Sequence, residues 1–235
     1  MSTPQAVTAT NRLLAALPRQ DYERLLAQCE PIELMFAEEI YGAGKLIPHV
    51  YFPIGSFISL VMPVDENANL EVGLVGTEGM LGATLLLGVD VAPFQAVVQG
   101  AGPALRIAVP AFLSELEQSP ALQRELKRYL YVSISQLAQT AACTRFHVVE
   151  ARLARWLLMT QDRAHCDRFH VTHVFLAYML GVRRVGVTKA ANSLQQRQLI
   201  SYHRGNVTIL DRIGLEAASC GCYQAEIETY ERILG

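Results

Sequence analysis

The segment from residue 172 to residue 196 constrains the fold most, because it fits two short helices joined by one sharp turn. Thr172 is a suitable N-cap for a helix over 173–180, and Gly181 follows at the point where the chain must turn. A second helix is predicted from Arg183 to Gln196. With Gly181 in the turn, the apolar residues fall at the buried positions of a helix-turn-helix, and the small Ala177 falls where the helices approach closely. The buried positions are Leu176, Leu180, Val182, Val187 and Ala190.

Two short β-type runs follow this pair of helices. Residues 199–202 and 207–210 alternate in a way that predicts strands, and the turn-rich residues 203–206 join them into a hairpin. An ordinary helical hairpin explains any one of these features. Their order, however, is that of a winged helix-turn-helix.

Charge is distributed unevenly along the chain, although its net charge is only -2. Residues 1–144 carry 8 basic and 14 acidic side chains, residues 145–212 carry 11 and 4, and residues 213–235 carry 1 and 4. No acidic residue occurs between Arg168 and Leu210. A run of charge is often only a solvated surface, but a single sign over such a length in an acidic protein favours contact with phosphates. We therefore predict that this segment binds duplex DNA.

The second helix of the pair is predicted to enter the major groove, where Arg or Lys recognises guanine and Asn recognises adenine. The candidate base-contacting residues on its polar face are Arg184, Thr188, Lys189 and Asn192. Phosphate contacts that set the register are expected at the helix starts and the hairpin. The candidates there are Thr172, Arg183, His203 and Arg204.

The N-terminal half reads as a β-rich unit. Residues 11–29 predict a short amphipathic helix interrupted by Pro18, and residues 32–109 contain short β-type runs separated by turn residues. Such regular spacing predicts a small barrel or sandwich.

A long helix is predicted from Pro120 toward Arg145, after the N-cap Ser119. Its apolar stripe packs either against the chain's own β domain or against a second subunit. The second alternative is favoured because a helix of roughly 38 Å is too long for a small domain to cover. The predicted dimer contacts are Leu126, Leu130, Ile134 and Leu137. In the helix that follows, Val148 is expected to face the core, and Arg152, Arg155 and Arg163 are expected to face mostly outward.

Several other classes of site are not supported by the sequence. Five cysteines without a disulfide spacing, no leader and no long apolar run predict a cytoplasmic protein without a membrane span. Neither the group His165, Cys166, His170 and His173 nor the pair Cys220 and Cys222 has a paired Cys-x2-Cys spacing, so no metal or cofactor is predicted. No catalytic residue is predicted either, because enzyme fingerprints are absent from the sequence and His49 is the only histidine before residue 147. The alternatives left open are a β-roll enzyme and an interaction scaffold whose basic face binds an acidic protein.

Four stretches of the sequence resemble the Crp/Fnr family of bacterial transcription regulators. They are Val50-Tyr-Phe-Pro53, Phe57-Ile-Ser-Leu-Val61, residues 175–184 and Leu199-Ile200. The resemblance covers nearly the whole chain and is strongest toward the C-terminus. It implies an α+β fold: a cyclic-nucleotide-binding-like β-roll over residues 1–118, a dimerisation helix over 119–145 and a winged helix-turn-helix over 146–235. It also implies a homodimer on two-fold-related half-sites. RNA polymerase and an unidentified small-molecule effector are further candidate partners.

The sequence departs from the best-known members of that family at three places. Val185 stands where they carry a glutamate on the recognition helix, so a different operator is expected, with Val185 touching a thymine methyl group. Gly82 is followed by Ala83, and Phe94-Gln95 stands where cyclic-nucleotide binders place an Arg-Ser/Thr pair. Both nucleotide anchors are therefore missing, and the effector is not expected to be a cyclic nucleotide. Only Cys29 lies near the N-terminus, where members with an iron-sulfur cluster carry several cysteines.

Overall fold

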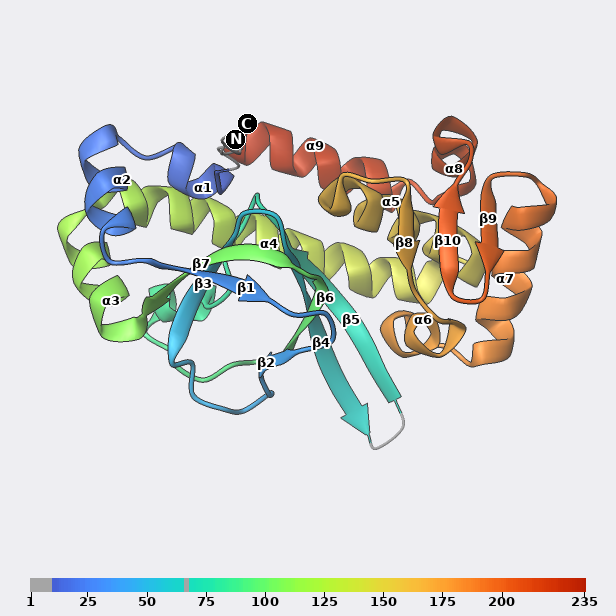
Figure 1. Ribbon diagram of the computed structural model, residues 1–235, viewed down its shortest axis with the longest axis horizontal. Helices are drawn as coiled ribbons and strands as arrows, with labels where there is room; N and C mark the ends of the chain where they lie inside the picture. Colours follow the sequence, from blue (N-terminus) through green and yellow to red (C-terminus); the bar gives the residue numbers. More distant parts are fainter. Residues whose placement is uncertain (1–9, 66–67) are drawn as a thin grey trace, which may run out of the picture.

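The computed structural model describes residues 10–65 and 68–235. A β-rich N-terminal part and a mostly helical C-terminal part lie at the two ends of an elongated molecule, and one long helix extends along both (Figure 1). This arrangement confirms the predicted α+β architecture. Within the described residues, no helix combines the length and the apolar character needed to cross a membrane.

The N-terminal part is built on two antiparallel sheets. One has the strand order β1 (Glu30–Leu34), β7 (Gly102–Ala108), β3 (His49–Pro53), and the other has the order β2 (Glu39–Tyr41), β6 (Gln95–Gly100), β4 (Phe57–Asp65), β5 (Ala68–Val75). The interior side chains of both sheets meet in one apolar core, which includes Phe52, Ile58, Val98 and Ile107. The polar residues 65–69, whose sequence predicts a turn, lie partly outside the described residues. Strands β1 and β2 have little β-type sequence of their own because they are rich in Glu. Each is held by pairing with a strand far along the chain, β1 with β7 and β2 with β6.

Short helices close this β-roll. The predicted N-terminal helix is two helices, α1 (Arg12–Ala15) and α2 (Arg19–Leu26), with Pro18 as the N-cap of the second. The 3-10 helix η1 (Ala83–Leu87) lies between β5 and β6, and α3 (Val109–Gln118) follows β7. The elements pack on the core through Leu14, Leu25, Leu85 and Phe112.

Helix α4 (Pro120–Phe146) connects the two parts of the molecule. Its bounds match the prediction, and the Ser119 side chain accepts a hydrogen bond from the Leu122 N–H at 3.0 Å as its N-cap. The prediction for Leu126 as a dimer contact is wrong, because this side chain is buried in the chain's own core. Farther along the helix, Leu130 and Leu137 are half-buried and Ile134 is 56% exposed.

The C-terminal part has a second apolar core. It comprises α5 (Val149–Ala164), β8 (Arg168–His170), α6 (His173–Leu180), α7 (Arg184–Gln196), β9 (Ile200–His203), β10 (Asn206–Ile209), α8 (Arg212–Ala218) and α9 (Cys222–Leu234). Phe57, Val61 and Leu74 of the β-roll also belong to this core. Helix α9 lies along α4, where Gln136 Nε2 donates to Glu226 at 2.6 Å. The two parts therefore share a packed interface.

The arginines of α5 point inward, contrary to the prediction. Arg155 forms an ion pair with Glu226 at 2.8 Å, and Arg163 pairs with Glu78 at 2.8 Å. Arg152 is 8% exposed. The prediction for Val148 is also wrong, because it precedes the helix as its N-cap and is 72% exposed. The basic charge of α5 is thus used inside the protein and is not available to a ligand at the surface.

Candidate nucleic-acid interface

Helices α6 and α7 form the predicted helix-turn-helix. Thr172 Oγ1 accepts a hydrogen bond from the Phe175 N–H at 3.1 Å and caps α6. Gly181 ends that helix with φ 61°, in the left-handed region that glycine adopts without strain. A Cβ atom at this position would also lie 3.2 Å from the Asn69 carbonyl oxygen on β5. The turn is therefore fixed by local backbone geometry and by contact with the β-roll.

Helix α7 has one buried and one exposed face. Val187, Ala190, Ala191 and Leu194 are buried in the C-terminal core. The predicted base-contacting residues Arg184, Lys189 and Asn192 are exposed, and Val185 is 60% exposed. Because these positions recur at helical spacing, they lie along a single side of α7.

Thr188 differs from its neighbours on this side of α7 because its hydroxyl is already engaged. Its Oγ1 lies 3.0 Å from His173 Nδ1 and donates to the Arg184 carbonyl oxygen at 3.1 Å. The His173 ring stacks on Tyr202, with 4.4 Å between the ring centroids. Burial, and then the nearby Arg184, lowers the pKa of His173. A mostly neutral His173 therefore joins α6, α7 and the hairpin.

The hairpin β9–β10 forms a wing beside α7 and pairs with β8, a strand that the sequence did not predict. His203 and Arg204 are exposed at its tip. Gly205 has φ 83°, and a Cβ atom there would lie 2.6 Å from the His170 ring. The tight turn thus presents two basic residues to solvent.

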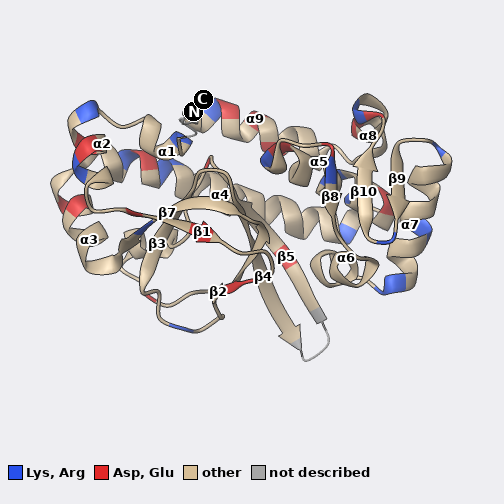
Figure 2. Ribbon diagram, in the orientation of Figure 1, with Lys and Arg blue, Asp and Glu red and all other residues tan. Residues whose placement is uncertain are grey.

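Basic residues gather on α7 and the neighbouring strands (Figure 2). Arg197 forms an ion pair with Glu150 at 2.9 Å. Within residues 10–65 and 68–235, the other Lys and Arg side chains of the acid-free segment have no carboxylate partner: Arg168, Arg183, Arg184, Lys189 and Arg204. They leave an exposed, uncompensated positive surface of the kind that phosphates bind.

A cavity of about 190 Å³ lies inside the β-roll, bounded by η1 and by α4. Among the residues that the structure describes, its walls are mostly apolar and contain no charged side chain, and they include Ala83, Phe94 and Ile134. Gln95 is not among them, since it contacts Glu39 and accepts a hydrogen bond from the Tyr178 hydroxyl at 2.9 Å. Arg106 pairs with Glu30 at 2.7 Å and does not line the cavity either.

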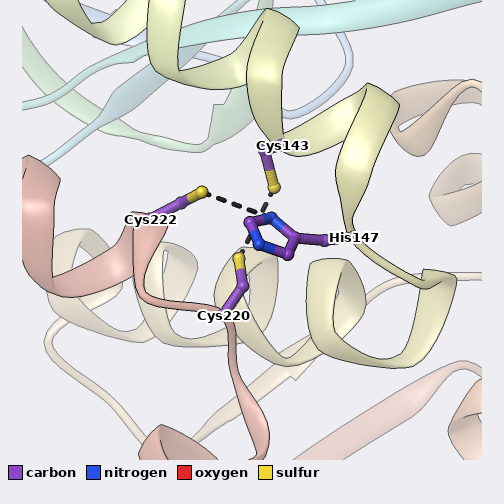
Figure 3. A group of neighbouring side chains, drawn as sticks. All are labelled: Cys143, His147, Cys220 and Cys222. Carbon is purple, nitrogen blue, oxygen red and sulfur yellow. Dashed lines mark hydrogen bonds between the residues drawn. The ribbon is translucent and has the colours of Figure 1, made fainter.

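A group of four side chains with metal-ligating atoms comes together where α4 meets α9. Cys143, His147, Cys220 and Cys222 point toward one another (Figure 3), and their ligating atoms lie within 4.8 Å of each other. A hydrogen bond with Cys220 lowers the pKa of Cys143 to about 4, against the opposing effect of burial. The sequence did not predict this set, because its two pairs are more than 70 residues apart. The histidines and cysteine of residues 165–173 form no such group in the described residues.

Comparisons with known proteins found a matching domain model and several similar structures. Residues 151–218 match the Crp-like helix-turn-helix domain. The structure resembles the c-di-GMP-responsive global regulator CLP of Xanthomonas campestris, with a TM-score of 0.68 and 18% identity over 82% of this chain and 99% of that chain. It also resembles FixK2 from Bradyrhizobium japonicum, with a TM-score of 0.69 and 13% identity over 82% and 98% of the two chains.

A third similar structure is a transcriptional regulator of the CRP family, TTHB099 from Thermus thermophilus. Its TM-score is 0.67 and its identity 18%, over 80% of this chain and 96% of that chain. A comparison with curated protein sequences found no match. Residues 151–218 are therefore a Crp-like helix-turn-helix domain, and the chain has the fold of these three proteins.

Proposed function

We propose that the protein acts as a homodimer that recognises an inverted-repeat operator. The observation that carries this proposal is the exposed, uncompensated basic side of α7 together with the exposed apolar side of α4. A two-fold axis beside α4 gives two recognition helices about 34 Å apart, which is one turn of duplex DNA. The dimer contacts in this proposal are Leu130, Ile134 and Leu137.

Within each half-site, Arg184 and Lys189 donate to guanine, Asn192 pairs with adenine and Val185 touches a thymine methyl group. Thr188 contributes its methyl group, since its hydroxyl is engaged by His173 and by the Arg184 carbonyl oxygen. Phosphate contacts come from the start of each helix and from the wing, at Thr172, Arg183, His203 and Arg204. All four of these residues lie at least partly in contact with solvent.

The β-roll cavity limits the size and charge of an effector that could bind there. Its volume of about 190 Å³ is below the roughly 300 Å³ at which pockets for drug-sized ligands begin. In the described part of the chain, its walls offer no cation to a phosphate. We therefore propose that any effector held there is small and largely uncharged, and that it is not a cyclic nucleotide. RNA polymerase remains a candidate partner of the DNA-bound dimer.

We also propose that the protein works in the cytoplasm and catalyses no reaction. All five cysteines are free, as in a reducing compartment. His49 is the only histidine of the β-roll sequence, so this part of the chain lacks the histidine pair of a barrel metalloenzyme.

Selection of bound duplexes from a random DNA pool tests the proposed function. We expect a two-fold symmetric consensus, and an affinity for it that falls steeply as salt concentration rises. Equal binding to all duplexes would contradict a sequence-specific regulator. Stronger binding to an acidic polypeptide than to any duplex would instead favour an interaction scaffold.

A further inference from the structure

The four side chains at the junction of α4 and α9 come from two short chain segments. Cys143 is buried in the last turn of α4, and the exposed His147 is the C-cap of that helix. Cys220 lies in the loop between α8 and α9, Cys222 is the first residue of α9, and both are buried. Each segment thus supplies two potential ligands at fixed spacing, and the fold brings the pairs together.

The distances between these atoms fit a tetrahedral metal site. Cys143 Sγ lies 3.5 Å from Cys220 Sγ, and Cys222 Sγ lies 3.4 Å from His147 Nδ1. In tetrahedral zinc sites the Zn–S distance is about 2.3 Å and the Zn–N distance about 2.0 Å, so neighbouring ligand atoms are about 3.5 to 3.8 Å apart. The side chains therefore need only small shifts to hold one ion.

We propose that Cys143, His147, Cys220 and Cys222 bind one Zn²⁺ ion in a closed site of three cysteines and one histidine. Three thiolates and one imidazole are a donor set that Zn²⁺ prefers, and four protein ligands leave no open position for a substrate. An iron-sulfur cluster places several atoms between its cysteine ligands and needs a wider arrangement than 4.8 Å. The site is therefore assigned a structural ion.

The surroundings of the site suit its charge. Gln139 Nε2 donates to Cys222 Sγ at 2.9 Å, as a group outside the ligand set does to a metal-bound thiolate. Arg152 is buried and has no carboxylate partner among the described residues. The acidic groups near enough to act on it are the thiols of Cys143 and Cys220. Zn²⁺ with three thiolates carries a net charge of -1, which would compensate this buried cation.

The position of the ion gives it a mechanical role. It joins the C-terminal end of α4 to the loop that connects α8, the helix after the wing, with α9. Helix α4 carries the proposed dimer contacts, and α8 packs against α5 beside the helix-turn-helix. The metal therefore fixes how the DNA-binding part is held on the long helix.

Titration of the full-length, reduced, metal-free protein with Co²⁺ tests the proposal, because tetrahedral thiolate-bound Co²⁺ absorbs visible light. We expect saturation at one Co²⁺ per chain and loss of the absorption when Zn²⁺ is added. Cys220→Ser and Cys222→Ser should lose the one-equivalent absorption. Cys29→Ser and Cys166→Ser are matched controls outside the site and should retain it.

A variant that remains folded is needed to distinguish loss of a metal ligand from loss of metal binding through misfolding. His147 is exposed, so His147→Ala should leave the circular dichroism spectrum unchanged but weaken Co²⁺ binding, and His147→Cys should restore it as a site of four thiolates. Absence of stoichiometric Co²⁺ and Zn²⁺ binding by the reduced wild type would overturn the proposal. Undiminished binding by the folded Cys220→Ser variant would overturn it as well. Neither readout depends on DNA binding, so the result is independent of the proposed function.

Discussion

The hydroxyl oxygen of Ser59 lies 2.7 Å from Oε2 of Glu71 and 2.5 Å from Oε1 of Gln99. One hydroxyl has a single hydrogen, so it cannot donate to both oxygens. Gln99 is held in its orientation because its Nε2 donates to Thr160 Oγ1 at 3.0 Å. The chain of hydrogen bonds is complete only if Glu71 is protonated and donates to Ser59. Burial raises the pKa of Glu71 to about 7, in agreement with this arrangement.

The raised pKa of Glu71 predicts that the free energy of unfolding depends on pH. In the unfolded chain Glu71 ionises near its ordinary pKa of about 4.3. Between that value and about 7 the folded state binds more protons than the unfolded state, so the free energy of unfolding decreases as pH rises. The stabilisation is fully present below pH about 4.3 and is lost above pH about 7. Its total is about 3 to 4 kcal/mol, at roughly 1.4 kcal/mol per pKa unit.

Urea unfolding of the wild type and of Glu71→Gln between pH 5 and pH 8 measures this contribution. The amide cannot ionise, so the variant should lack the Glu71 part of the slope and gain stability relative to the wild type as pH rises. The comparison cancels the titration of the histidines, which both proteins share. Parallel pH profiles would show that Glu71 is ionised in the folded protein.

The two classes of DNA contact should respond differently to substitution. Lys189→Ala removes a proposed base contact and should cost about 1 to 3 kcal/mol on the selected duplex, with relaxed base choice at one position. Arg204→Ala removes a proposed phosphate contact, so it should weaken binding to all duplexes alike and reduce the salt slope by about 1. Fluorescence anisotropy with selected and random duplexes at several salt concentrations separates these outcomes.

Arg197→Ala is the matched control for these substitutions. Its side chain is in the same acid-free segment, but Glu150 already neutralises it at 2.9 Å. It should change DNA affinity less than either of the other substitutions. If Lys189→Ala and Arg204→Ala have the same effect on selected and random duplexes, the assignment of base and phosphate contacts is incorrect.

The helix-turn-helix could be predicted closely because local signals define its ends. Thr172 caps α6, and Gly181 ends it with a backbone conformation that favours glycine. The start of α4 could likewise be predicted, because the local pair Ser119-Pro120 marks it. These signals act within a few residues, so a single sequence contains them in full.

The sequence-based predictions were wrong or incomplete for residues whose partners are distant in the sequence. Arg155 and Arg163 were predicted to be surface charges because the carboxylates that neutralise them are far away in the sequence. Glu226 is 71 residues from Arg155, and Glu78 is 85 residues from Arg163. Strand β8 was missed because its three residues are stabilised by pairing with β10 and not by their own pattern. The closeness of Cys143 and Cys220 was missed for the same reason, because these residues are far apart in the sequence. Only the tertiary fold brings these groups together.

The apolar side of α4 predicts a substitution that should dissociate the proposed dimer. Ile134 is 56% exposed in the single chain, so Ile134→Glu should not disturb the fold. In a dimer it would bury an unpaired charge, at a cost of about 3 kcal/mol or more, which raises the dimer Kd at least about 100-fold. Sedimentation equilibrium measures that change.

Ile213→Glu provides a control with the same chemical change, at a side chain that is 80% exposed on α8. It should leave the dimer Kd unchanged. A wild type that is monomeric at micromolar concentration, or equal effects of the two substitutions, would count against the dimer through α4.

The last prediction is that neither cyclic AMP nor cyclic GMP binds in the β-roll. A phosphate buried there needs a cation to offset its desolvation, because an unpaired charge in a low-dielectric site costs several kcal/mol. The described residues that line the cavity include no cation, and Arg106 is held by Glu30 outside it. Calorimetric titration should give no Kd tighter than about 10 μM, near -7 kcal/mol. Tighter binding that Arg106→Ala abolishes would mean that Arg106 leaves Glu30 and reaches the cavity, and that the nucleotide is the effector after all.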